Sequence, residues 1–424
     1  MKASDVFIPG SFPTETYIQR SDKDYETVLR DALSIDGMVV SISGPSKSGK
    51  TVLIEQVVGK DCLISISGAG IKTPSDLWNS VLDWMESPYE MRETLKHTDK
   101  VGTEIGVSGG ASVFGFAKAE AGAKGKLDSE NGTEKHTTHQ RTGASQVVRE
   151  IANSDYVILV DDFHYIPRAM QGEVARQIKD VVRQKVKICA ATVSHRGDDV
   201  MRANPELRGR LQTIDLPYWE ISDLKKIATT GLSKLNTQIN EKSLEHLTKE
   251  AAGSPQLMQL ICLQMCFVKN LRSKPLSSVN IEIYEQDLSA IFEQTSTSTD
   301  FRSLFNVLDC GPKLRGKERK IYKFKDGSSG DVYRCILKGI AADPPTLSFN
   351  YDSLVTRTRS ICTDEFPSGS SLSGSCAQMI KLAQDNFPNE RAIDWDAEKE
   401  VLDIPDPYLS FYLRWSGRLL EKAD

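Results

Sequence analysis

The residues with the clearest chemical meaning form a glycine-rich stretch at positions 44–51. It matches the pattern G-x-x-x-x-G-K-[ST] with Gly44, Pro45, Ser46, Lys47, Ser48, Gly49, Lys50 and Thr51. The pattern predicts a phosphate-binding loop, because glycines let backbone N–H groups approach phosphate oxygens and the helix that follows adds its dipole. We expect Lys50 to contact the β- and γ-phosphates of ATP and the Thr51 hydroxyl to bind Mg²⁺.

Two carboxylates follow a second apolar run. Residues 156–160 are apolar and are followed directly by Asp161 and Asp162. A buried parallel strand has such a continuous apolar run, and its C-terminal end lies at the same edge of the sheet as the phosphate loop. We therefore expect Asp161 to hold Mg²⁺, through water, and Asp162 to orient the attacking water.

Further candidates come later in the chain. The strand expected at 186–193 places Thr192 at its end, followed by Ser194 and Arg196, and any of these could sense the γ-phosphate. Arg208 and Arg210 could stabilise negative charge on a nucleotide held by a neighbouring subunit. An equally good explanation for the two arginines is a solvated helix C-terminus, which basic residues favour.

The elements around these motifs alternate between strand and helix. Strands are predicted at 38–42 and 62–66, and helices at 25–33, 52–58 and 75–85, which indicates an α/β core with a parallel sheet over residues 1–219. Residues 220–275 have helical patterns and predict a lid, with a sharp joint at Gly253, Ser254 and Pro255. Residues 276–330 are expected to form a connector, and 331–424 a last α+β domain.

The alternation stops between about 99 and 145. Within 101–116, apolar residues tend to share one parity while glycines and polar residues take the other, which favours an insertion with a hairpin and a mobile tip. A disordered glycine-rich loop is the main alternative. Assembly between subunits, or contact with a membrane, is a further one.

Composition narrows the classes of function. The chain has 424 residues, of which 39% are hydrophobic and 26% charged, with a net charge of −5, and this argues against a general polyanion binder. We find neither a signal peptide nor a run long enough for a membrane helix, and therefore expect a cytoplasmic protein. The eight cysteines are expected to be reduced core residues, and Cys262 and Cys266 lack companions for a metal site.

Taken together, these motifs resemble the AAA+ superfamily over about residues 5–270, with the closest likeness to the origin-recognition-like branch and to STAND-type signalling ATPases. The resemblance implies a P-loop αβα core with a helical lid, ATP and Mg²⁺ as ligands, and a homo-oligomer. Hydrolytic AAA+ motors usually have Asp-Glu where this chain has Asp161 and Asp162, and many have an arginine where Gln256 follows Pro255. Both departures resemble STAND-type switches, in which such a proline packs near the base and turnover is slow.

The C-terminal residues 331–424 resemble a winged-helix module, with helices expected near 331–337, 351–355 and 371–385 and the wing and closing segment at 401–415. This region has 10 Lys and Arg against 15 Asp and Glu, and its third helix has only Lys381 as a basic residue. Contact with a protein, or autoinhibition, is therefore favoured over DNA binding. Arg357 and Arg359 leave DNA binding open.

The leading hypothesis is an ATP-binding, slowly hydrolysing switch that oligomerises and signals to a separate effector or regulatory protein, as in prokaryotic antiviral defence. The alternatives are a DNA-binding ATPase of a replication or transposition type, and a membrane-acting assembly that uses the 101–116 hairpin.

Overall fold

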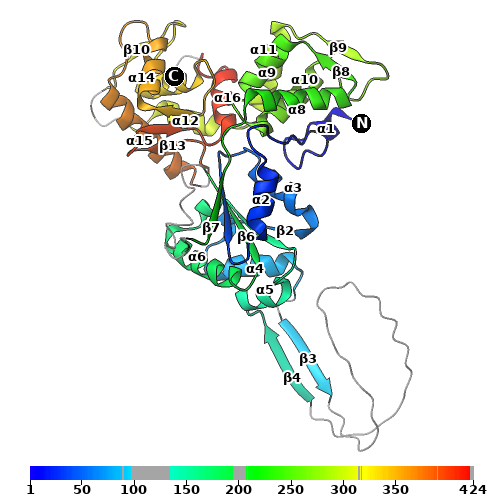
Figure 1. Cartoon of the computed structure of the whole chain (residues 1–424). Helices are drawn as coiled ribbons and strands as arrows, with labels where there is room; N and C mark the ends of the chain where they lie inside the picture. Colours follow the sequence, from blue (N-terminus) through cyan, green and yellow to red (C-terminus); the bar gives the residue numbers. More distant parts are fainter. Residues whose placement is uncertain are drawn as a thin grey trace, which may run out of the picture.

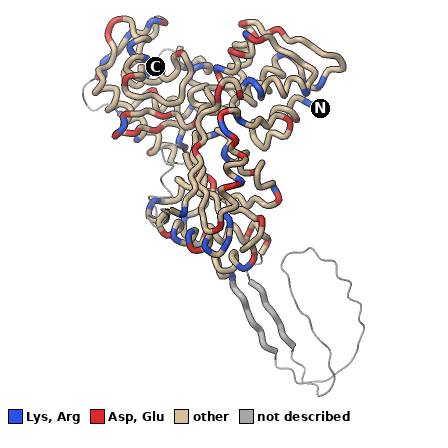
Figure 2. The backbone as a smooth tube through the Cα atoms, viewed as in Figure 1, with Lys and Arg blue, Asp and Glu red and all other residues tan. Residues whose placement is uncertain are grey.

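The computed structural model describes residues 1–87, 90–96, 134–193, 207, 209–313, 316, 318–388 and 390–420. In Figure 1 the α/β core forms the lower body, and two mainly helical bodies lie above it; the backbone tube of Figure 2 shows the same arrangement. Among the described residues no helix is both long enough and apolar enough to cross a membrane.

The core is built on a five-stranded parallel sheet. Its strands are β2 (Leu63–Ser67), β5 (Val157–Asp161), β6 (Lys187–Thr192), β1 (Val39–Ser43) and β7 (Leu211–Asp215), in that spatial order. Every pair of neighbours runs parallel. All the strands therefore end at one edge of the sheet, and β1, which lies between β6 and β7, is buried along its whole length.

Helices cover both faces of this sheet. On one face α2 (Tyr25–Ser34) and α3 (Lys50–Val58) pack on alternate strand residues such as Val40 and Ile42. On the other face α4 (Pro74–Trp84), α5 (Ala144–Ile151) and α6 (Arg168–Val182) pack on the intervening residues, such as Ile158 and Val160. The arrangement confirms the predicted αβα core, because strands covered by helices on both faces have largely apolar sequences.

A two-stranded antiparallel hairpin extends away from the core (Figure 1). It pairs β3 (Glu90–Lys96) with β4 (Glu134–Gln140), from Glu90 opposite Gln140 to Lys96 opposite Glu134. The pairing strands thus begin before the expected start of the insertion at residue 99. The hairpin predicted within 101–116 lies outside the described residues.

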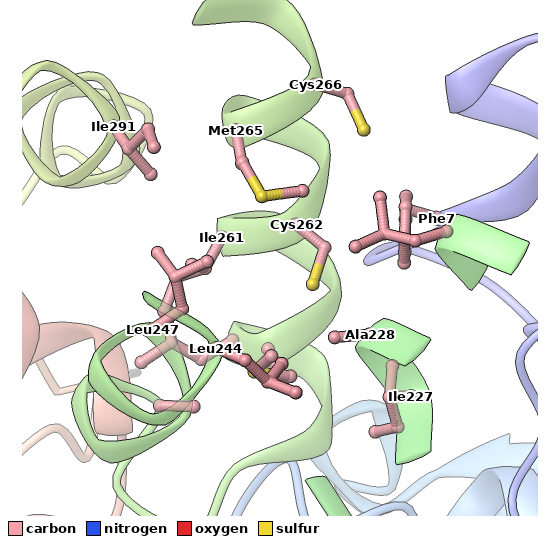
Figure 3. Packing of buried hydrophobic residues seen from close by; sticks show 14 of the residues in the cluster. Phe7, Ile227, Ala228, Leu244, Leu247, Ile261, Cys262, Met265, Cys266 and Ile291 are labelled. Carbon is pink, nitrogen blue, oxygen red and sulfur yellow. The ribbon is translucent and has the colours of Figure 1, made fainter. Parts of the chain in front are cut away.

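The lid contains α8 (Ile221–Lys234), α9 (Glu241–Glu250), α10 (Pro255–Val268) and α11 (Glu285–Thr297), with β8 (Thr237–Ile239) paired to β9 (Val279–Ile281). Figure 3 shows part of its core, in which Cys262 and Cys266 lie on the side of α10 that faces Phe7, a residue from the start of the chain. Phe7 follows α1 (Ala3–Val6), so the N-terminal residues pack on the lid. These two cysteines are free and buried as predicted, whereas Cys310 is exposed and Cys62 only half-buried, contrary to the expectation of core residues.

The C-terminal body follows the order helix, strand, helix, helix, strand, strand. These elements are α13 (Val332–Ala341), β12 (Ser348–Asn350), α14 (Tyr351–Ile361), α15 (Gly369–Asn386), β13 (Asp394–Asp396) and β14 (Val401–Asp403), and the chain continues into α16 (Pro407–Trp415). The strands form an antiparallel sheet in the order β12-β14-β13. Helices α13, α14 and α15 lie near the three helices expected at 331–337, 351–355 and 371–385, and the expected wing and closing segment at 401–415 contains β14 and α16. The assignment as a winged-helix module stays a prediction.

The expected connector, 276–330, is itself folded. Its first part, β9 and α11, packs in the lid. Its later part contains α12 (Arg302–Cys310), whose Leu304, Phe305 and Leu308 join the C-terminal core. The short strands β10 (Tyr322–Lys323) and β11 (Ser329–Gly330) then lead into α13.

Helix α16 joins the C-terminal body to the lid. Its Phe411 contacts Phe292 of α11 edge to face, with ring centroids 5.8 Å apart. At its C-terminal end Arg414 forms a two-pronged ion pair with Glu250 of α9, at 2.7 and 2.9 Å, and both side chains are nearly buried. Trp415 Nε1 donates to the same carboxylate at 2.7 Å. A buried pair with this many hydrogen bonds fixes the relative position of the two bodies.

Candidate nucleotide-binding site

The glycine-rich stretch forms a loop between β1 and α3, as predicted. Helix α3 begins at Lys50, and its N-cap, Gly49, has φ of 93° and no side chain to cap the helix. Because glycine has no side chain, the N-cap residue does not occupy the first backbone N–H groups of α3, and these groups can face an anion. Gly44 is required at its position, because a Cβ there would lie 2.7 Å from the Leu216 carbonyl oxygen.

Lys50 is folded into this loop. Its Nζ donates to the carbonyl oxygens of Gly44 at 3.0 Å and of Pro45 at 2.8 Å, and its side chain is buried. Burial lowers the pKa of Lys50, and the nearby Asp161 and Asp162 oppose that shift only in part. The ammonium is thus held by neutral carbonyl groups of the loop. Phosphate anions bound in the loop would be stronger hydrogen-bond partners for it.

Thr51 and Asp161 meet directly, although they belong to different elements. Thr51 Oγ1 donates to Asp161 Oδ2 at 2.7 Å, and Asp161 Oδ1 accepts the backbone N–H of Asp162 at 2.9 Å. Hydroxyl and carboxylate oxygens are the ligands that Mg²⁺ prefers, and Mg²⁺ in such sites takes few protein ligands beside phosphate and water. These two residues fit that role. Within the described part of the chain, no group of three or more His, Cys, Asp or Glu residues could hold a metal.

Asp162 lies one residue beyond Asp161, at the end of β5. Its backbone is in the left-handed region, with φ of 53°, and begins a short turn at Phe163–Tyr165. Burial raises the pKa of the Asp162 carboxyl, and the charge of Asp161 adds to this, while Lys50 and Arg391 act in the opposite direction. A carboxylate that is costly to ionise and lies beside the loop suits a group that accepts a proton from water.

Thr192 ends β6, which lies between β5 and β1. Its Cα is paired in register with Ser43, the last residue of β1 before the phosphate loop. The residue is fully buried, and its Oγ1 has no hydrogen-bond partner among the described residues; the same holds for Ser48 Oγ within the loop. Buried hydroxyls without partners are costly, so a bound phosphate or its water would satisfy them. The other candidates near this strand, Ser194 and Arg196, lie outside the described residues.

Arg210 directly precedes β7 and lies where the parallel strands begin, whereas the phosphate loop lies where they end. Its carbonyl oxygen accepts the N–H of Val39 at 2.8 Å, at the start of β1, and the loop follows the end of that strand. Five strand residues span about 16 Å, so Arg210 cannot contact the nucleotide of its own subunit. Two interpretations remain compatible with this position: a contact with the nucleotide of a neighbouring subunit, and a solvated basic residue without a nucleotide contact. Its companion Arg208 lies outside the described residues.

The lid reaches the loop through its glycine joint. Pro255 begins α10, and its Cγ lies 4.0 Å from the place where a Cβ on Gly49 would be. Ser254 Oγ donates to the Lys47 carbonyl at a long 3.5 Å. Gly253, with φ of 81°, is required because a Cβ there would lie 2.8 Å from the Tyr218 side chain.

Sequence reasoning missed several contacts of the loop. Trp219 Nε1 donates to the Ser48 carbonyl at 2.8 Å, and the Arg20 guanidinium lies over the Trp219 ring at 5.5 Å. Asp406, just before α16, pairs with Lys47 at 2.7 Å. The tryptophan beside Pro217 and Tyr218 was a usable signal, but nothing in the sequence connects Asp406 with a loop 359 residues away.

Comparisons with known proteins show which solved structures share this fold. No family model and no curated protein matches the chain. Among solved structures, a Walker-type ATPase of Pyrococcus abyssi aligns with a TM-score of 0.50 and 12% identity, over 94% of this chain and 98% of its own. Cdc6p from Pyrobaculum aerophilum aligns with a TM-score of 0.43 and 12% identity, over 98% of this chain and 97% of its own. The ORC2 protein of Aeropyrum pernix aligns with a TM-score of 0.46 and 10% identity, over 96% of each chain. The chain thus has the fold of a Walker-type P-loop ATPase.

Proposed function

We propose that this protein is an ATP-dependent switch that binds ATP with Mg²⁺, hydrolyses it slowly and signals its nucleotide state to a protein partner. The observation that carries the proposal is the convergence of all three bodies on the phosphate loop. The core supplies Thr51 and Asp161 at 2.7 Å, the lid supplies Ser254, and the C-terminal body supplies Asp406. A loop touched by two other bodies can convert the presence of phosphate into a movement between them.

Slow turnover is supported by the acidic residues of the site. Asp162 occupies the position that activates water, and its carboxylate is shorter by one methylene than the glutamate found in hydrolytic AAA+ motors. We therefore propose that the nucleotide acts as a signal that persists between exchange events.

We further propose that the active form is an oligomer in which Arg210 contacts the nucleotide of the neighbouring subunit. The support is the position of Arg210, which lies at the end of the sheet opposite its own phosphate loop.

Replacing Arg210 with alanine is expected to leave nucleotide affinity unchanged while lowering hydrolysis by about 10-fold or more, because arginine stabilises charge that develops only during phosphoryl transfer. Turnover should be measured over a range of protein concentrations, together with mass photometry in ADP and in a slowly hydrolysed ATP analogue. Arg183→Ala is a control for loss of a basic residue at the C-terminal end of α6. Persistent monomers with both nucleotides would contradict the role of Arg210.

The partner that we propose is a separate effector or regulatory protein. The acidic pair of strands β13 and β14 supports this, because residues 394–403 contain five Asp and Glu against Lys399 alone. Such a surface repels phosphate backbones and suits a basic protein surface. The proposal of a role in antiviral defence rests on the resemblance of the motifs to STAND-type ATPases. Comparing phage infection of cells with wild-type protein and with Lys50→Ala would test it.

DNA binding is a second candidate, favoured by one specific observation. Lys323 and Lys325 are exposed on β10 and just after it, on the C-terminal body but away from the acidic strands β13 and β14, while the neighbouring Lys320 pairs with Glu365. If they contact phosphates, duplex binding measured by fluorescence anisotropy should fall steeply with salt, and the double variant Lys323→Glu/Lys325→Glu should lose it. Failure of the wild-type protein to retain duplex at low salt, with and without ATP, would dismiss this candidate.

A further inference from the structure

The C-terminal body contributes a carboxylate to the phosphate loop. Both side-chain oxygens of Asp406 accept hydrogen bonds from Lys47 Nζ, at 2.7 and 2.8 Å. The same ammonium lies 4.1 Å from the centre of the Tyr408 ring. Lys47 is in the middle of the loop and has φ of 60°, so the backbone turns sharply at the residue that makes this contact.

The position of Asp406 is fixed by its own helix. Asp406 Oδ1 also accepts the backbone N–H of Tyr408 at 3.0 Å, which makes the residue the N-cap of α16. At the far end of this helix, Arg414 is held by Glu250 of the lid, with side chains 8% and 5% exposed. A negative charge is therefore presented to the phosphate loop by a helix that is anchored at both ends, rather than by a freely moving surface side chain.

We propose that Asp406 is a specificity-determining residue of the nucleotide site, which disfavours ATP relative to ADP. The inference rests on the proposed nucleotide binding. Phosphates that enter the loop repel the Asp406 carboxylate and compete with it for Lys47. Because ATP carries more negative charge than ADP, the repulsion acts more strongly on ATP.

The coupling also acts in the reverse direction. If docking of Asp406 weakens ATP binding, then ATP weakens the docking of α16 on the loop by the same factor, because linkage between two binding equilibria is reciprocal. ADP does so less. The C-terminal body thus responds to the charge of the bound nucleotide. The Lys47 and Asp406 side chains are 28% and 22% exposed, so salt screens the effect in part.

Asp406→Asn tests this inference, because asparagine keeps the helix cap and removes the charge. Affinities for fluorescent ADP and for a fluorescent, slowly hydrolysed ATP analogue should be measured on the full chain. In the variant, affinity for the ATP analogue is expected to rise about 5-fold or more relative to that for ADP. This gain should shrink as KCl is raised from about 0.05 M to about 0.5 M. The matched control is Asp352→Asn, which removes an exposed carboxylate from α14 of the same body and should leave the ratio unchanged.

A second measurement follows the docking itself. By small-angle X-ray scattering, the radius of gyration of the wild-type protein should increase with the ATP analogue and change less with ADP. Asp406→Asn should show the larger value without nucleotide. If the wild-type protein binds both nucleotides and Asp406→Asn leaves their affinity ratio at the wild-type value, the inference is wrong while the proposed function stands. If the wild-type protein binds neither nucleotide, the proposed function falls and the inference falls with it.

Discussion

Lys50→Ala is expected to abolish ATP binding. In the wild-type protein the Lys50 ammonium is buried within the phosphate loop with only carbonyl partners, at 2.8 and 3.0 Å, and phosphates would replace them. Without this cation, the negative charges of ATP would lie beside Asp161 and Asp162, and position 50 would no longer supply a positive side chain to balance them. Thermal unfolding with and without ATP and Mg²⁺ measures the change. At a ligand concentration of about 100 times the Kd, the wild-type protein should gain about 2.7 kcal/mol, and the variant nothing.

Loss of binding in this variant should not reflect loss of folding. Because the pKa of Lys50 is lowered, its charged form is less favourable in the folded protein than in the unfolded chain. The folded state therefore holds fewer protons than the unfolded state between the lowered pKa and 10.5, and wild-type stability rises with pH through that window. The nucleotide-free variant should therefore still unfold cooperatively, because removing a charge that burial disfavours offsets part of the packing and the two hydrogen bonds lost with the side chain. Lys60→Ala, an exposed lysine after α3, is the matched control. An unchanged ATP affinity in Lys50→Ala would refute the site.

Asp162→Asn is expected to lower hydrolysis by about 10²- to 10⁴-fold while ATP affinity changes only a few-fold. The amide can still donate a hydrogen bond to water, but it cannot accept the proton of the attacking water. Single-turnover hydrolysis with saturating ATP separates the chemical step from binding. Asp155→Asn, an exposed residue just before β5, is the matched control. Hydrolysis at the wild-type rate in Asp162→Asn would assign the water-activating role to another residue.

The pH dependence of this variant follows from the raised pKa of Asp162. Wild-type hydrolysis should rise with pH as the carboxyl ionises and should then level off, and Asp162→Asn should lack this rise.

The stability of the wild-type protein should change with pH in the opposite sense. The folded protein keeps the Asp162 proton above the ordinary value of 3.8, where the unfolded chain has lost it, so wild-type stability falls as pH rises from 3.8 through the raised pKa. The melting temperature of Asp162→Asn relative to wild type should therefore increase through that window.

Local patterns allowed much of the core to be predicted from sequence. The order of strand, phosphate loop and helix at 39–58 is encoded within twenty residues, and the structure forms β1, the loop and α3 there. The run ending at Asp161 gives β5 for the same reason, since a strand buried on both faces must be apolar at each position. The helices of the C-terminal body also follow their local patterns, at α13, α14 and α15.

Local patterns could not show which distant segments meet. The connector expected at 276–330 is divided between the lid and the C-terminal core, because the exposed or buried state of α11 and α12 depends on partners far away in sequence. Likewise, the strand order places Arg210 at the edge of the sheet opposite the phosphate loop, which a linear motif cannot reveal.

The sequence by itself determined the phosphate loop, the paired carboxylates and the α/β class, because each depends on hydrophobic spacing and residue type over a few neighbouring positions. Only the tertiary structure decided that Thr51 bonds to Asp161, that Thr192 is buried beside the end of β1, and that Asp406 pairs with Lys47. These contacts join residues more than 100 positions apart, and they exist only when the packing of the sheet, the lid and α16 brings those residues within hydrogen-bond or ion-pair distance.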